Sequence, residues 1–129
     1  MSTIKKVIRS EKAPAAVGPY SMAIQLGELV FTAGQLPINP KTGNIVEGGI
    51  EAETRQALTN LQNVLIAADS SLEMVLKTTV FLKDINDFSR MNGVYAEFFK
   101  EAPPARSAFQ VAALPKGASV EIEAIAAHL

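Results

Sequence analysis

The chain has 129 residues, of which 48% are apolar and 19% are charged, and its formal net charge is −1. This length predicts a single domain over 1–129 with one hydrophobic core. The charge balance argues against a dedicated nucleic-acid binder, which normally carries a basic face. The absence of cysteine excludes disulfides, thiolate catalysis and cysteine-based zinc sites. The single histidine, His128, lies beside the C-terminus, and we expect it on the surface.

Targeting signals are weak in this sequence. No apolar run approaches the ~20 residues that a membrane span needs. The first twelve residues are basic but lack the apolar core of a secretory signal, and Glu11 and Pro14 disfavour a mitochondrial presequence. The last three residues, Ala127-His128-Leu129, have the small-basic-Leu form of a peroxisomal address. We therefore expect a cytoplasmic protein, with a peroxisomal or mitochondrial location as the alternative.

Apolar periodicity and turn residues predict the elements in chain order. Short strands are expected at 7–9, 23–26 and 29–32. Helical spacing of apolar residues predicts a helix over 50–68, followed by a strand rich in Val, Thr and Phe over 75–82. A second helix is expected over 87–100, with an apolar stripe of Phe88, Met91, Tyr95 and Phe98, and Pro103 and Pro104 follow its end. The last two strands are expected at 107–113 and 120–127.

The final strand alternates cleanly, with Val120 and Ile122 on one side and Glu121 and Glu123 on the other. The order of elements predicts an α+β fold whose two helices cover one face of a sheet. Local turn chemistry at 115–117 would join the last two strands as a hairpin. Several strands are apolar or small on both sides, as at 78–82, so the second face needs a cover, and the simplest cover is another copy of the chain.

Three charged residues near the C-terminus could carry chemistry. Arg106 opens a strand, and its fork of donors suits a carboxylate or a phosphate; the alternative is an exposed, solvated arginine. Glu121 and Glu123 share one face, and paired carboxylates can act as general acid and base. The alternative for this pair is a solvated strand face.

Three further residues could shape a pocket. Tyr20 follows a Gly-Pro turn and could wall a site, or simply pack on the core. Gly34 ends a strand and would allow close approach to the backbone, or merely form a turn. Asn92 lies within the second helix, where asparagine is usually a surface residue. The sequence has no glycine-rich phosphate loop, no metal-binding pattern with histidine and no G-x-S-x-G elbow.

Six stretches, in order, resemble the signature of the RidA (YjgF-type) family of 2-iminobutanoate/2-iminopropanoate deaminases. The resemblance covers essentially the whole chain. The stretches are 13–21 (APAAVGPYS), 33–37 (AGQLP), 84–88 (DINDF) with Asn92, 104–107 (PARS), 111–117 (VAALPKG) and 120–126 (VEIEAIA).

The resemblance implies a chorismate-mutase-like fold with a six-stranded mixed sheet and two helices on one face. It implies a homotrimer with a barrel-like centre and sites at subunit interfaces, and last two strands that are not neighbours. The implied substrates are 2-aminoacrylate and related imines, which yield 2-keto acids and ammonia without a cofactor or metal. By the same resemblance Arg106 holds the substrate carboxylate and Glu121 activates water. Tyr20, Asn92 and the backbone of Gly34 and Ala108 contact the ligand.

Three departures from the family pattern bear on substrate preference: Ala33 replaces a serine, Ala108 a cysteine and Met22 a glutamine. If the last two strands are antiparallel, Arg106 and Glu121 lie about 15–20 Å apart along the strand direction at ~3.3 Å per residue. The working pair is therefore expected to come from two subunits. The alternatives are an RNA-cleaving translation inhibitor and a non-catalytic sensor of small carboxylates.

Overall fold

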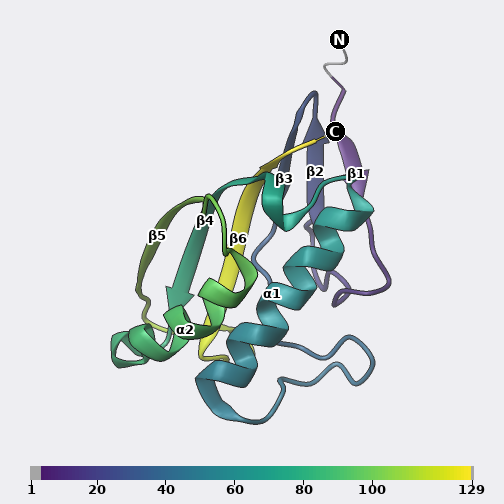
Figure 1. The fold of residues 1–129 in the computed structure, drawn as a ribbon. Coiled ribbons are helices and arrows are strands. Elements are labelled where there is room, and N and C mark those ends of the chain that lie inside the picture. Colours follow the sequence, from purple (N-terminus) through teal and green to yellow (C-terminus); the bar gives the residue numbers. More distant parts are fainter. Residues whose placement is uncertain (1–3, 129) are drawn as a thin grey trace.

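The computed structural model describes residues 4–128, which form a six-stranded mixed sheet with two α-helices on one face (Figure 1). The predicted α+β class is confirmed, and four strands have the expected bounds. The helices are α1 (Gly49–Ala67) and α2 (Phe88–Phe98). The strands are β1 (Lys6–Ile8), β2 (Ala23–Leu26), β3 (Leu29–Thr32), β4 (Val75–Leu82), β5 (Ala105–Gln110) and β6 (Val120–Ala127).

The strand order is β1-β2-β3-β6-β4-β5, and only β4 and β5 are parallel. The predicted hairpin between the last two strands is therefore wrong, and the arrangement implied by the family resemblance is confirmed. A parallel pair cannot be joined by a tight turn, and α2 supplies the crossover from β4 to β5. The apolar side of β6 is buried by its central position, whereas the largely exposed β5 occupies the edge.

The core lies between the helices and one face of the sheet. Alternate residues of each central strand point toward α1, which packs directly on β6. Fully buried side chains on this face include Val30, Val80, Leu82, Val120 and Ile122 from the sheet, with Leu58, Leu61, Val64 and Leu65 from α1. This packing fixes which residues of β6 point away from the helices, and Glu121 is one of them.

The other sheet face carries a continuous apolar row. Val7 pairs with Ile24, Ile24 with Phe31, and Phe31 with Ile125, so these side chains share one face across four strands. Val7 and Phe31 are 45% and 40% exposed. Phe109 of β5 is also exposed on this face, where its ring meets Phe81 edge-on at 5.5 Å. An exposed apolar patch of this kind is typical of a contact surface.

Candidate active site

Arg106 is held on the helix side of the sheet by its own chain. It pairs in register with the buried Thr78, and so it projects toward α2. Its Nη1 donates a 2.7 Å hydrogen bond to Asn92 Oδ1. The guanidinium carbon lies 5.4 Å from the centre of the Phe88 ring and 4.8 Å from that of Tyr95. Contacts at these distances stabilise a cation against aromatic faces, so the side chain has a defined direction.

Tyr95 packs against Arg106 and is itself fixed by a hydrogen bond. Its hydroxyl and that of Thr78 are 2.7 Å apart in a buried hydrogen bond. Burial raises the pKa of the Tyr95 phenol, although the Thr78 hydrogen bond and the Arg106 charge oppose the rise. The phenol therefore stays neutral at physiological pH, and the ring offers Arg106 an aromatic face rather than a counter-charge.

Arg106 retains donors for a ligand. A guanidinium has five N–H donors, and only one of those on Arg106 donates to a residue within 4–128. No Asp or Glu of the described chain lies within ion-pair distance of it. A fixed fork with free N–H groups can take a carboxylate through two parallel hydrogen bonds.

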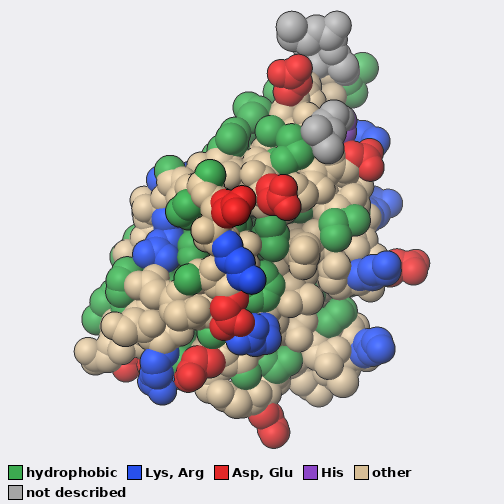
Figure 2. Space-filling model, viewed as in Figure 1, with side chains coloured by type: hydrophobic (Ala, Val, Ile, Leu, Met, Phe, Trp, Pro, Cys, Tyr) green, Lys and Arg blue, Asp and Glu red, His purple; other side chains and the backbone are tan. Residues whose placement is uncertain are grey.

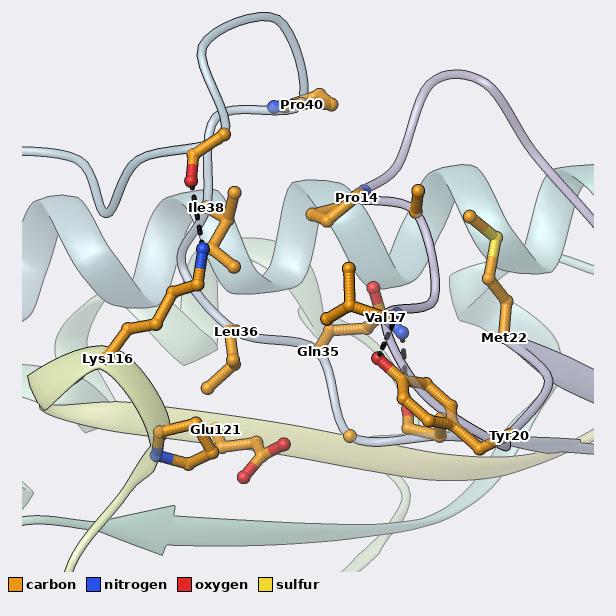
Figure 3. Close-up of a pocket in the computed structure, with 15 residues that line it drawn as sticks. Pro14, Val17, Tyr20, Met22, Gln35, Leu36, Ile38, Pro40, Lys116 and Glu121 are labelled. Atoms are coloured by element: carbon orange, nitrogen blue, oxygen red, sulfur yellow. Dashed lines mark hydrogen bonds between the residues drawn. The ribbon is translucent and has the colours of Figure 1, made fainter.

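Glu121 belongs to a separate cavity of about 550 Å³. The cavity is bounded by the start of β6, by the chain that follows β3 and by the segment before β2. Figure 3 shows the Glu121 carboxylate pointing into this space, with Tyr20 on one side and Lys116 on the other. Tyr20 Oη accepts a 3.4 Å hydrogen bond from the Val17 N–H, which leaves the ring along the wall.

The Glu121 carboxylate is half-buried and unpaired. Within residues 4–128 it neither accepts a hydrogen bond nor forms an ion pair. Burial raises the pKa of Glu121, and the nearby negative charge of Glu123 adds to that rise. Desolvation and a like charge both disfavour the ionised form. A carboxylate in this condition is a stronger base than one in water.

Gly34 makes room for Glu121. After β3 the chain stays against β6, where Gln35 N–H donates to Ile122 O at 2.8 Å and Ile122 N–H donates back to Gln35 O at 3.1 Å. A Cβ atom on Gly34 would stand only 2.8 Å from Glu121 Cδ and 2.9 Å from its Cγ. Glycine lets the Glu121 side chain lie against the backbone here, which is a more specific reason than the expected turn.

The predicted site residues thus fall into two groups. Tyr20, Gly34 and Glu121 share the cavity, whereas Arg106 and Asn92 meet beside α2. Ala108 belongs to the second group, two residues along β5 and packed against the core.

The sheet separates the two charged groups within one protomer. Through β4, Arg106 is level with Ala124, three residues from Glu121 or about 10 Å along the strands. The predicted separation along the strand direction of about 15–20 Å is therefore too long. The reason is that β5 and β6 both pair with β4, and this pairing sets their relative register. The side chains nevertheless cannot meet, because they leave opposite faces of the sheet.

Sequence reasoning missed three contributors to these groups. Phe88 and Tyr95 were expected as part of the apolar stripe of a helix, and no periodicity distinguishes a core aromatic from one that faces a cation. Lys116 was expected only in a turn, but it lines the cavity.

In the described part of the chain, no group of three or more His, Asp or Glu side chains could hold a metal ion. Neither helix there is long and apolar enough to cross a membrane.

The fold and the site define a small α+β protein with a cavity that contains a carboxylate, and the chain is similar to known proteins. Residues 10–128 match the family model described as Endoribonuclease L-PSP. A RutC family protein of Pyrococcus horikoshii is 56% identical over 123 residues, 95% of this chain and 98% of that protein. The 2-iminobutanoate/2-iminopropanoate deaminase of Bos taurus is 51% identical over 125 residues, 97% of this chain and 91% of that protein.

Solved structures agree with the sequence relatives. A protein of the conserved Rid family from Yersinia pestis superposes with a TM-score of 0.93 at 49% identity, covering 96% of this chain and 99% of that one. The chain belongs to the RidA (YjgF-type) family.

Proposed function

We propose that this protein hydrolyses reactive 2-enamino and 2-imino acids, such as 2-aminoacrylate, 2-iminopropanoate and 2-iminobutanoate, to 2-keto acids and ammonia. The observation that carries the proposal is the unpaired, half-buried carboxylate of Glu121. Folding does not need such a group, but water activation does. The relative named 2-iminobutanoate/2-iminopropanoate deaminase supports the choice of reaction.

The two halves of the site come together, in this proposal, between protomers of a homotrimer. Within one chain Arg106 and Glu121 leave opposite faces of the sheet, so a second copy must supply one of them. The exposed apolar face around Phe31 and Phe109 supports such an assembly, because its burial would stabilise contact between sheets. The site would then lie in the cleft where the Arg106 of one copy faces the cavity of the next.

The proposed reaction depends mainly on the orientation of the substrate and of one water molecule. The guanidinium of Arg106 binds the substrate carboxylate, while Glu121 accepts a proton from a water that attacks the imine carbon. An enamine such as 2-aminoacrylate first gains a proton at C3 and loses one from nitrogen, which gives the imine. The water oxygen then bonds to the imine carbon, and the C=N electron pair takes a proton at nitrogen. Collapse of the resulting carbinolamine expels ammonia and leaves the 2-keto acid, with no electron transfer. Tyr20 and Asn92 would orient the substrate and Arg106, and the backbone at Gly34 and Ala108 would contact the ligand.

Removal of Arg106 tests the proposal directly. Arg106→Ala should lower kcat/KM for freshly generated 2-aminoacrylate by about 10²–10³-fold, because a fixed, charge-assisted pair of hydrogen bonds is lost. The measurement is ammonia release, with size-exclusion chromatography to check that the assembly persists. Arg55→Ala is the matched control, since Arg55 pairs with Glu97 on the surface. Unchanged turnover in Arg106→Ala would remove Arg106 from the site.

The description of the matching family model favours one alternative, RNA cleavage. Contacts with phosphates require clustered Lys and Arg, whereas Figure 2 shows basic and acidic side chains interspersed over the helix face. RNA cleavage that survives Arg106→Ala, with binding that weakens steeply as salt rises, would favour the nuclease. Binding of 2-keto acids without ammonia release would instead indicate a non-catalytic carboxylate sensor.

A further inference from the structure

The side chain of Lys116 crosses one end of the Glu121 cavity. It starts from the short turn Pro115–Gly117 that precedes β6, and its Nζ donates a 3.2 Å hydrogen bond to the carbonyl of Gly43. Lys116 and Gly43 both line the cavity, so this link spans part of its wall (Figure 3). We call the Lys116 side chain with its hydrogen bond to Gly43 the lysine strap.

The backbone at Lys116 is in a conformation that favours glycine. Its φ of 57° and ψ of 20° are left-handed, and Gly117 follows with a φ of 69°. A side chain with a Cβ is disfavoured in this region, yet only the second of the two positions is glycine. Strained residues of this kind gather at binding and catalytic sites, where the surroundings impose the conformation. Asp69 and Ala102 share this backbone region without lining the cavity, so it is the hydrogen bond to Gly43 that connects Lys116 to the cavity wall.

The strap joins two well-anchored segments. On the β6 side, Ala118 N–H donates to Pro115 O at 3.1 Å, and Ser119 N–H donates to the buried Glu53 Oε1 at 2.8 Å. On the other side, Asn39 N–H donates to Asn44 O at 2.9 Å and Gly43 N–H to Asn39 O at 2.8 Å, which closes a compact loop. With both ends held by backbone hydrogen bonds, the flexible part of the link is the lysine side chain itself.

The chemistry of this end of the cavity is apolar. Leu36, Ile38 and Pro40 line the wall near the strap, and in Figure 3 the strap and Tyr20 lie on opposite sides of the Glu121 carboxylate. Lys116 has no acidic partner within the described residues. Its four methylene groups can therefore serve as wall, while its ammonium is held on the Gly43 carbonyl.

The cavity is also large for the smallest substrates. Its volume of about 550 Å³ falls within the ~300–1,000 Å³ typical of sites for drug-sized ligands. A three- or four-carbon acid beside Glu121 would leave space toward Leu36 and Ile38. The length of the substrate's carbon side chain would then decide whether it reaches the strap.

We propose that the lysine strap is a specificity determinant, which closes the apolar end of the cavity and limits the side-chain length of the 2-imino acids that bind beside Glu121. This inference rests on the proposed function, because it assumes that an imino acid or its keto-acid product occupies the cavity. Lys116 takes no part in the bond-breaking steps. Its effect is on which substrates fit.

The test compares unbranched 2-keto acids from three to six carbons, as products, and the matching imines, as substrates. Binding is measured by titration calorimetry, and turnover by ammonia release. Lys116→Ala should raise the six-carbon to three-carbon ratio about tenfold in both assays, because methylene groups that met the strap gain space. Lys116→Met, which keeps the length but loses the hydrogen bond, should move the ratio in the same direction by a smaller factor. Lys116→Gln should stay near the wild type.

Lys41→Ala is the matched control. It removes a lysine from the same loop as Gly43, but Lys41 does not line the cavity, so its ratio should equal that of the wild type. An unchanged ratio in a folded, active Lys116→Ala variant would overturn the strap alone. If the wild type neither bound nor hydrolysed any acid of the series, the proposed function would fail, and the strap with it.

Discussion

Arg106 and Glu121 are the two charged groups of the candidate site, and the chain treats them in opposite ways. Arg106 is held in place by its own protomer, through Asn92 and the rings of Phe88 and Tyr95. Glu121 is given a cavity and a bare glycine backbone, but no donor and no counter-charge within residues 4–128. One group is positioned in advance, and the other is left unsatisfied.

This difference indicates a division of labour. A binding group gains from rigidity, because a fixed fork loses little entropy when it takes a carboxylate. A base gains from the absence of partners, because every hydrogen bond to its ionised form would lower its pKa. Real proteins leave a few polar groups unsatisfied, and functional sites are where such departures are expected. Glu121 is such a breach, whereas the buried Glu53 is satisfied by Ser119 N–H.

The role of the unpaired carboxylate is tested most directly by a substitution of Glu121. Glu121→Gln keeps the shape but removes the base, so imine hydrolysis should fall by about 10²–10⁴-fold. Glu123→Gln is the matched control on the same strand and face, two residues away. At a pH well above the pKa of Glu121, the Glu123→Gln variant should retain most of the wild-type rate. The measurement is the initial rate of ammonia release, and equal rates for the two variants would contradict the role of Glu121.

Mixed assemblies test whether the two groups act across a subunit boundary. Arg106→Ala and Glu121→Gln protomers should each have at most about 1% of the wild-type activity alone, but co-refolded in equal amounts they should recover about a quarter of the wild-type sites. An intact arginine (one half) must meet an intact glutamate (one half) in each cleft of a closed ring. The measurement is ammonia release per protomer after co-refolding. No recovery, in mixtures shown to exchange subunits, would place both groups in one chain.

Gly34 offers a smaller perturbation of the same cavity. Its φ is not in the left-handed region, so an alanine there is unstrained and acts only by pushing on Glu121. Gly34→Ala should lower kcat by about 10–100-fold, since a displacement of about 1 Å at a catalytic group can cost that much. Gly93→Ala is the control, because a Cβ at Gly93 meets no atom within 4 Å. Steady-state kinetics of both variants check this, and full activity in Gly34→Ala would argue against close contact with Glu121.

Most of the fold could be predicted from apolar periodicity and from turn residues. The main error was the predicted pairing of the last two strands. Alternation along 120–127 identified both faces of β6, including the side that carries Glu121. The turn at 115–117 suggested a hairpin because turn residues show that the chain reverses there. They do not show which strand the next strand pairs with. What decided the pairing was the burial of β6 under α1, a long-range effect that no short window contains.

The site was less accessible to sequence reasoning. Arg106 and Asn92 are 14 positions apart and meet only because α2 carries the chain back to a strand parallel to β4. Gly34 and Glu121 are farther apart still, and their contact depends on the bridge between Gln35 and Ile122. Residue type and position named them as candidates, but their assignment to one site came from the family resemblance. Phe88, Tyr95 and Lys116 had no signal that separated their roles from those of a core stripe or a turn.

The smallest expected effect is a coupling between the two charges, measured through stability. In the protomer, burial and Glu123 raise the pKa of Glu121, so folding favours its protonated form. That stabilisation is complete below the carboxyl's unfolded pKa and is lost as the pH rises through the raised value. Near neutral pH the ionised carboxylate is therefore a burden on the fold, and Glu121→Gln should stabilise the protein by about 1 kcal/mol or less. In acid the difference should vanish.

A guanidinium from a neighbouring protomer would offset that burden, because an opposite charge favours the ionised carboxylate. The gain from Glu121→Gln should then be larger in an Arg106→Ala background than in the wild type, with a coupling energy of about 0.5–1 kcal/mol. Urea unfolding of the four variants at fixed protein concentration, near neutral pH and in acid, measures it. Within one chain the sheet keeps the two groups apart, so a coupling that appears near neutral pH and disappears in acid requires the charges to face each other between copies. If the effects of the two substitutions on the free energy of unfolding are additive at both pH values, Arg106 and Glu121 do not share a cleft.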